Sequence, residues 1–263
     1  MNILLDPTAR PVIGHRGNRA HAPENTIESS AQAVALGADA SEFATMVTAD
    51  GIPVVNHDPT VMRTTNGLGE IERMTFAELR MLDAGSNFTK DSGKTFPYRG
   101  AGHRIPSLDE VIEAFPSTPL LIEIKTPLAA TGVLNAIRAH KAEERTLVDS
   151  FSADALRVFE GTDIAFGAST PDVARLMYEV VLHRPITPLL FRALCIPLSY
   201  RNVPLPVKRI ARIAPEHGCR VHVWTVNDPA VAKRLWKSGV SGIITDDPQV
   251  MLKLRSQLPV VTG

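Results

Sequence analysis

The feature that most constrains the fold of this chain is a regular alternation of short β-rich runs with amphipathic helical stretches along most of its 263 residues. Such alternation is typical of parallel βαβ units. We predict strands at residues 12–14, 38–47, 53–56, 120–124, 146–151, 164–168, 194–197, 221–226 and 242–245. We predict helices at residues 26–36, 75–82, 107–114, 131–140, 171–182, 206–217 and 229–238.

About eight strands in a chain of about 260 residues favour a closed α/β barrel of the (β/α)8 TIM type, although periodicity alone leaves an open doubly wound sheet as an alternative. Apolar residues make up 44% of the chain and charged residues 21%. This composition is close to the average for a soluble globular protein and predicts a sizeable buried core. We therefore expect a single domain over residues 1–263.

Two segments break the regular alternation. Asp50-Gly51 joins two predicted strands through a tight turn with no helix between them, because glycine tolerates a positive φ. Residues 59–105 contain no clear strand but several turn signals, such as Asn66-Gly67 and Gly85-Ser86. We predict that residues 59–105 form an insertion on one rim of the barrel, between its third and fourth strands.

Charge and targeting signals exclude several classes of protein. Lysine plus arginine and aspartate plus glutamate both number 28, so a nucleic-acid partner is not expected. The N-terminal residues do not resemble a signal peptide, and no run of about eighteen apolar residues predicts a transmembrane segment. Cys195 and Cys219 give neither a disulfide framework nor a metal-binding spacing, so we expect a cytoplasmic protein.

Two histidines stand at the ends of predicted strands. His15 is followed by Arg16, and His57 is followed by Asp58, which could orient it. Because TIM-barrel active sites lie at the C-terminal ends of strands, the two histidines form a candidate acid–base pair. Arg16 offers a planar fork suited to phosphate. Taken singly, each of these residues could equally be a surface, packing or capping residue.

Three charged residues lie within apolar predicted strands or directly after one. Glu123 and Lys125 point to the same side because side chains alternate along a strand, and burying them is costly unless each has a partner. A metal ion for Glu123 and a phosphate for Lys125 would satisfy both, and a self-contained ion pair is the alternative. Glu42 could bind a hard cation such as Mg²⁺ or Ca²⁺, or could pair with a nearby arginine.

These clusters belong to longer motifs that follow one another along nearly the whole chain. The first half contains His15-Arg16-Gly17, Ala22-Pro23-Glu24-Asn25-Thr26, Gly37-Ala38-Asp39, Thr48-Ala49-Asp50-Gly51, Pro53-Val54-Val55-Asn56-His57-Asp58 and Arg63-Thr64-Thr65-Asn66-Gly67. The second half contains Ile105-Pro106-Ser107-Leu108, Glu123-Ile124-Lys125, Ser150-Phe151, Val223-Trp224-Thr225-Val226-Asn227 and Gly242-Ile243-Ile244-Thr245-Asp246-Asp247-Pro248. In this order the motifs resemble the glycerophosphodiester phosphodiesterase family.

The resemblance implies a TIM barrel that uses a divalent metal, Mg²⁺ or Ca²⁺, to hydrolyse small-molecule glycerophosphodiesters to glycerol phosphate and an alcohol. Each functional position of the family is matched to a residue here by its motif. The matches are His15 and His57 (acid–base pair), Arg16 (catalysis and phosphate), Glu42 and Glu123 (metal ligands), Lys125 (phosphate) and Trp224 (substrate pocket).

The chain departs from the family at position 44. The family's metal motif reads Glu-x-Asp, whereas this chain reads Glu42-Phe43-Ala44, and a methyl group cannot bind a hard cation. We therefore expect a weakly bound or absent metal and attenuated or lost activity. The substitution is either engineered, or natural with water or another side chain such as Asp58 or Asp39 completing the metal shell, or a mark of lost turnover.

Three functions follow from these alternatives. We expect a hydrolase, because His15, Arg16, His57, Glu123 and Lys125 are all retained. The others are a non-catalytic glycerophosphodiester-binding barrel and a phospholipase D-like lyase that releases a cyclic phosphate.

Several further residues are expected to have structural roles. We expect Asn25-Thr26 and Asp246-Asp247 to cap helices, and His222 lies in a strand pattern without any motif. Residues 180–200, rich in leucine, isoleucine and phenylalanine, form either ordinary core with a rim loop or an apolar lip for lipid-like substrates.

Overall fold

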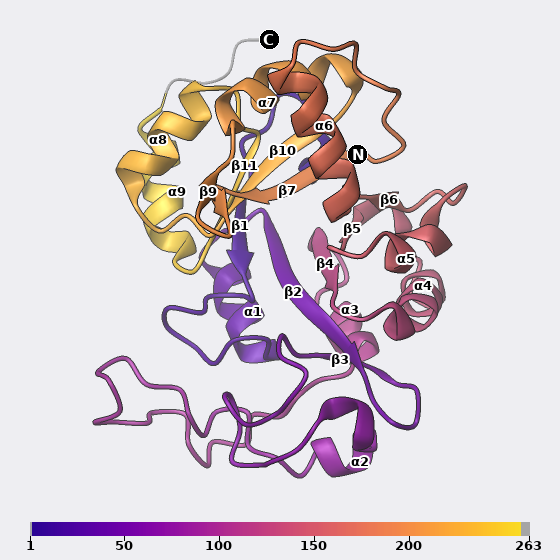
Figure 1. Cartoon of the computed structure of the whole chain (residues 1–263). Helices are drawn as coiled ribbons and strands as arrows, with labels where there is room; N and C mark the ends of the chain where they lie inside the picture. The colour runs from indigo at the N-terminus through magenta and orange to yellow at the C-terminus, as the bar shows by residue number, and fades with distance from the viewer. Residues whose placement is uncertain (1, 259–263) are drawn as a thin grey trace.

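A computed structural model describes residues 2–258 of the chain (Figure 1). The predicted domain, 1–263, also includes residue 1 and residues 259–263, which lie outside the described part. Within the described residues, the main sheet contains eight parallel strands in the order β6-β5-β4-β2-β1-β11-β10-β7. These strands are β1 (Val12–His15), β2 (Ala40–Val47), β4 (Leu120–Ile124), β5 (Thr146–Asp149), β6 (Ala165–Phe166), β7 (Ala193–Pro197), β10 (Arg220–Trp224) and β11 (Gly242–Thr245).

The ring of strands closes between β6 and β7. An isolated parallel bridge joins Gly167 to Ala193, and the amide of Ala168 donates a hydrogen bond to the carbonyl of Ala193 at 2.9 Å. A closed ring of eight parallel strands is a TIM barrel, so the predicted fold is confirmed and the open sheet is excluded.

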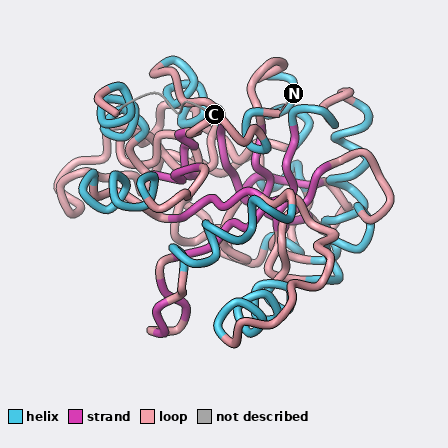
Figure 2. The backbone as a smooth tube through the Cα atoms, turned by 90° about the horizontal axis from the view of Figure 1, so that it is seen from above, coloured by secondary structure: helices cyan, strands magenta, loops and turns pink. Residues whose placement is uncertain are grey.

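Each barrel strand is followed by a helix before the next barrel strand begins. The helices are α1 (Ile27–Ala35), α3 (Leu108–Ala114), α4 (Ala130–Ala139), α5 (Ala153–Leu156), α6 (Thr170–Val181), α7 (Val207–Ile213), α8 (Pro229–Lys237) and α9 (Pro248–Ser256). Seen from above, the strands gather at the centre and most helices lie outside them (Figure 2). In residues 2–258 no helix has both the length and the apolar character needed to cross a membrane.

The predicted strands and helices have their observed counterparts within a few residues. The predicted ranges omit α5, the small hairpin of β8 (Ser199–Tyr200) and β9 (Val203–Pro204), and the helix α9, of which only the cap was expected. Apart from α9, these elements span four residues or fewer, and so short a segment has no readable periodicity. None of them changes the order of strands in the barrel.

The predicted tight turn at Asp50-Gly51 forms a hairpin that projects from the barrel. Strand β3 (Pro53–Val55) pairs antiparallel with the end of β2, with Thr45 opposite Val55, so β3 is not a barrel strand. Residues 59–105 follow β3 and contain the short helix α2 (Phe76–Leu79). They lie below the C-terminal ends of β1 and β2 in Figure 1, as expected for a rim insertion.

Two layers of side chains fill the barrel interior. The first is apolar and consists of residues contributed by six strands: Ile13, Ala40, Leu121, Leu147, Ala193 and Ile244. Because side chains alternate across a strand, the residues two positions further along face the same interior. On five of these strands they are His15, Glu42, Glu123, Asp149 and Cys195. A polar layer therefore lies above the apolar layer, at the C-terminal end of the barrel.

The N-terminal segment closes the opposite end of the barrel. Leu4, in a turn of 3₁₀ helix at Ile3–Leu5, is fully buried in the interior cluster. Its carbonyl accepts a hydrogen bond of 2.9 Å from Nε2 of His222 on β10, and Nδ1 of His222 is buried without a partner. His222 is therefore a neutral core residue that anchors the N-terminal segment, and burial lowers its pKa to about 4.

We predict that His222 makes the stability of the protein depend on pH between its ordinary pKa of about 6.5 and its folded pKa of about 4. The unfolded chain takes up a proton at His222 in this window and the folded chain does not. The stabilisation is therefore complete above pH 6.5 and falls by up to about 1.4 kcal/mol per pH unit as the pH is lowered towards 4. Urea unfolding at several pH values should show a shallower dependence for His222→Gln.

The exposed His217 provides the control, because His217→Gln should keep the wild-type dependence on pH. An NMR titration in which the His222 ring takes up its proton near pH 6.5 in the folded protein would contradict the prediction.

Candidate active site

A pocket opens at the polar layer of the barrel. It has a volume of about 520 Å³, part of it open to solvent. Its lining contains every residue proposed from the sequence for catalysis, metal binding or substrate binding, together with Asp149, Phe151 and Cys195 and two apolar residues of the barrel interior. The proposed residues are His15, Arg16, Glu42, His57, Glu123, Lys125 and Trp224. Residues predicted from five separate motifs therefore lie around one cavity.

The Arg16-Gly17 turn positions the first part of the site. Arg16 follows β1 in the left-handed region, with φ of 55°, and its amide donates a hydrogen bond of 2.8 Å to Oε2 of Glu42. Gly17 has φ of 85°, and a Cβ there would lie 2.4 Å from the backbone of Ser29 in α1. A residue with a side chain could not pack so close to the helix, and this explains the glycine in the His15-Arg16-Gly17 motif.

Both candidate catalytic histidines are oriented by aspartates. Nδ1 of His15 lies 2.6 Å from Oδ1 of Asp246, and Nδ1 of His57 lies 2.6 Å from Oδ1 of Asp58. These bonds leave Nε2 of each ring for a ligand in the pocket. Burial lowers the pKa of His57, with Lys125 and Arg16 acting in the same direction, although the bond to Asp58 opposes the shift.

Asp246 and Asp247 were both expected to cap a helix. Asp247 does cap α9, since its side chain accepts a hydrogen bond from the amide of Val250. Asp246 instead binds His15 and accepts a hydrogen bond of 2.8 Å from Nδ2 of Asn227. Asp246 directly follows the C-terminal end of β11, and this position could have indicated that its side chain belongs to the active site.

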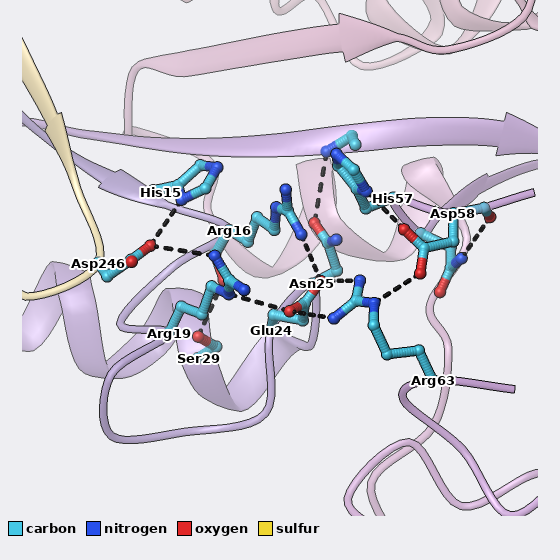
Figure 3. A network of polar contacts seen from close by, with 12 residues as sticks. His15, Arg16, Arg19, Glu24, Asn25, Ser29, His57, Asp58, Arg63 and Asp246 are labelled. Carbon is cyan, nitrogen blue, oxygen red and sulfur yellow. Dashed lines mark hydrogen bonds and ion pairs between the residues drawn. The ribbon is translucent and has the colours of Figure 1, made fainter. Parts of the chain in front are cut away.

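Glu24 is the buried centre of a cluster of arginines (Figure 3). Its carboxylate lies 2.7 Å from Nη1 of Arg16, 3.0 Å from Nε of Arg19 and 2.7 Å from Nη2 of Arg63. Burial alone would raise the pKa of Glu24, but the hydrogen bond from Arg63 and the three positive charges outweigh it. The pKa of Glu24 is therefore held well below its ordinary range.

The same cluster connects the two histidine–aspartate pairs. Nε of Arg63 lies 2.5 Å from Oδ2 of Asp58, and Nη1 of Arg19 lies 3.4 Å from Oδ1 of Asp246. Each arginine thus bridges Glu24 to an aspartate that orients a histidine, as Figure 3 shows. Glu24 stands in one of the motifs, but its role could not be predicted, because Arg63, which links it to Asp58, lies 39 residues away.

The candidate metal ligands lie on neighbouring strands. Burial raises the pKa of Glu42, and the nearby Glu123 adds to this shift, whereas His15, the amide of Arg16 and its positive charge oppose it. Oε2 of Glu123 lies 2.7 Å from Nζ of Lys125, so these two form the ion pair that the sequence left as an alternative. Within residues 2–258 no three acidic, histidine or cysteine side chains are already arranged as a metal-binding group.

Position 44 lies beside this pair of glutamates. The methyl group of Ala44 is fully buried. Its backbone is held from both sides: its amide donates to Oδ1 of Asn25 at 3.3 Å, and its carbonyl accepts from the amide of Asn56 at 3.0 Å. Asn25 therefore does not cap α1 as expected, and Thr26 alone does.

Aromatic side chains form one wall of the pocket. Nε1 of Trp224 donates a hydrogen bond of 2.9 Å to the carbonyl of Cys195, and its ring meets Phe151 edge-on with centroids 6.0 Å apart. Nζ of Lys125 lies 5.9 Å from the centroid of Phe151. Burial raises the pKa of Cys195 well above its ordinary value, so its thiol stays protonated.

A second pocket adjoins the first and is mainly apolar. It has a volume of about 630 Å³ and shares Asp149, Phe151 and Cys195 with the first pocket. The side chains that give it its apolar character come from α6, β7 and the segment before α7; they include Val173, Met177, Ile196 and Leu205. The region 180–200 therefore contributes both to the core and to an apolar space next to the site.

The family follows from comparison with known proteins. A family model described as the glycerophosphoryl diester phosphodiesterase family matches residues 15–250. The chain belongs to this family. Its members are phosphoric diester hydrolases, and the resemblance predicted from the motifs is confirmed.

Two relatives illustrate the similarity. A glycerophosphodiester phosphodiesterase of Caldanaerobacter subterraneus subsp. tengcongensis is 36% identical over 92% of this chain and 96% of its own length. A phosphodiesterase structure from Oleispira antarctica, in complex with the product sn-glycerol-3-phosphate, is 29% identical and has a TM-score of 0.77. That alignment covers 95% of this chain and 98% of the other.

We predict that Glu24→Gln destabilises the protein by about 3 kcal/mol, because it leaves three arginines around a neutral amide in a largely buried position. Urea or thermal unfolding measures this loss. The matched control is Glu70→Gln, which breaks an exposed pair with Arg73 and should change the stability by less than about 0.5 kcal/mol. Equal effects of the two variants would show that the arginine cluster does not need Glu24.

Proposed function

We propose that this protein hydrolyses glycerophosphodiesters to glycerol phosphate and an alcohol at the pocket around His15 and His57. The observation that carries the proposal is the orientation of the two histidines. Both bind an aspartate through Nδ1 and line the same pocket, beside the cationic side chains of Arg16 and Lys125. The product-bound relative from Oleispira antarctica supports glycerol phosphate as the product class.

The two histidines would divide the proton transfers between them. One accepts a proton at Nε2 from the attacking hydroxyl, which belongs to water or to the substrate's own glycerol, and the other donates a proton to the leaving alcohol as its bond to phosphorus breaks. Where the glycerol hydroxyl attacks, a water molecule then opens the cyclic phosphate to give glycerol phosphate. Asp246 and Asp58 hold the rings and stabilise whichever imidazole is protonated. Arg16, whose Nε is buried without a partner, would bind the non-bridging oxygens of the phosphodiester.

The site also fits a divalent cation, which Glu42 and Glu123 would hold. Carboxylate oxygens are the ligands that Mg²⁺ and Ca²⁺ prefer, and the partnerless, buried Oδ1 of Asp149 in the same pocket shows an excess of acceptor atoms. A bound cation would polarise the phosphoryl oxygens and stabilise negative charge there. Lys125 would place its ammonium beside the phosphate once Glu123 releases it.

We predict that His15→Ala and His57→Ala each lower kcat for glycerophosphocholine by about 100-fold or more, because each removes a proton-transfer group. Release of choline, measured with added Ca²⁺ or Mg²⁺, provides the assay. His217→Ala, an exposed histidine outside the pocket, should leave kcat unchanged.

The alternatives give different outcomes. A chain that binds glycerophosphocholine without turnover, and whose Ala44→Asp variant binds metal but also remains inert, would be a binding protein. The adjoining apolar pocket favours a lyase acting on lipid-like phosphodiesters as the second candidate. That activity would appear as a cyclic phosphate in the phosphorus NMR spectrum of the products of a lysophospholipid.

A further inference from the structure

Three residues on neighbouring strands form a row across the barrel interior. Ala44 of β2 is in register with Glu123 of β4, and Glu123 is in register with Asp149 of β5. Residues in register on parallel strands point to the same face of the sheet. Glu42, two residues before Ala44, shares this face. The position where the family has a carboxylate thus lies two strands away from an aspartate that faces the same interior.

Asp149 has acceptor capacity that the protein itself does not use. Its Oδ1 is buried and has no hydrogen-bond partner. Nζ of Lys125 lies 2.7 Å from Glu123 and does not form an ion pair with Asp149. A buried carboxylate with an unused oxygen is costly unless a ligand or a proton compensates it. Asp149 lines the pocket that contains Glu42 and Glu123, so such a ligand could reach it.

Gly167 makes room for this carboxylate. A Cβ at position 167 would lie 2.2 Å from Oδ1 of Asp149, so no other residue type could stand there without displacing the side chain. Gly167 has no positive φ that would require a glycine. Space for Asp149 is therefore the physical reason for a residue without a side chain at this position.

The other two aspartates that could replace the missing ligand are engaged elsewhere. Asp39 precedes β2 at the opposite end of the barrel, where it accepts a hydrogen bond from the amide of Val12 and pairs with Arg255. Asp58 binds His57 and Arg63. Neither lines the pocket, whereas Asp149 does.

We propose that Asp149 supplies the carboxylate that Ala44 lacks, so that Glu42, Glu123 and Asp149 together bind a divalent hard cation. The inference rests on the proposed function for the expectation that a cation binds here. Three carboxylates on adjacent inward positions offer the oxygen donors that Mg²⁺ and Ca²⁺ require. Glu123 exchanges its contact with Lys125 for the ion, and the released ammonium becomes available to the substrate phosphate.

Metal titration tests the proposal without any reading of turnover. Calorimetric titration with Ca²⁺ and with Mn²⁺ as a paramagnetic substitute for Mg²⁺ is performed on the wild type, Asp149→Asn, Ala44→Asp and the double variant. Asp149→Asn should weaken binding by about tenfold or more, since even loss of groups that only support metal ligands costs about 10–100-fold. The double variant Ala44→Asp/Asp149→Asn should regain most of the affinity, because β2 again supplies the carboxylate.

Two further variants control the interpretation. Asp154→Asn removes an exposed aspartate on α5 and should bind metal as the wild type does. Gly167→Ala changes no charge but displaces Oδ1 of Asp149, so it should weaken binding while the metal-free protein keeps its circular dichroism spectrum. If metal affinity is the same in Asp149→Asn and the wild type, or if only Ala44→Asp binds metal at all, the proposal is wrong.

The outcome is separable from the proposed hydrolysis. A protein that binds metal through Asp149 but turns over no glycerophosphodiester would overturn the proposed function and leave this inference standing. A protein that hydrolyses its substrate while Asp149→Asn keeps full metal affinity would overturn this inference alone.

Discussion

In a closed parallel barrel, every second side chain of every strand has to face the interior, and both the core and the candidate site of this protein depend on this alternation. The apolar layer around Leu121 and Leu147 excludes water from the middle of the barrel. Two residues further along, the same strands present Glu123 and Asp149 to the pocket. The strands that build the core therefore also hold His15, Glu42, Glu123 and Asp149, whereas Arg16 and His57 lie in the segments that follow β1 and β3.

The alternation of strands and helices favoured a barrel but left an open sheet as an alternative, and the resemblance of the motifs to a known family decided between them. The residues proposed for the site could be named from the sequence because each motif is local. His57 does lie at the C-terminal end of the barrel, as predicted, but the reason given for this position was partly wrong. It follows the end of a strand, as expected, but β3 runs antiparallel to the barrel strands and brings His57 back to the mouth from a projecting hairpin. The residues of a strand do not reveal whether it runs parallel or antiparallel to its neighbours.

What the sequence left out are the contacts between distant segments. Asp246 binds His15 across 231 residues, and Glu24 binds Arg63 across 39. Local spacing carries no information on such pairs, because they form only when the barrel closes. Through Arg19 and Arg63, the single carboxylate of Glu24 sets the position of both aspartates that orient histidines. The residue that holds these charged groups together, Glu24, thus lies outside the pocket.

The hydrogen bonds at Ala44 have a consequence for how this family can change. The backbone of residue 44, and not its side chain, binds Asn25 and the amide of Asn56, next to His57. A substitution at position 44 can therefore change the side chain without shifting His57, because the bond from Asn56 is made to the backbone of residue 44. The backbone contacts of residue 44 do not depend on which side chain stands there, so the side chain can change while the scaffold stays constant.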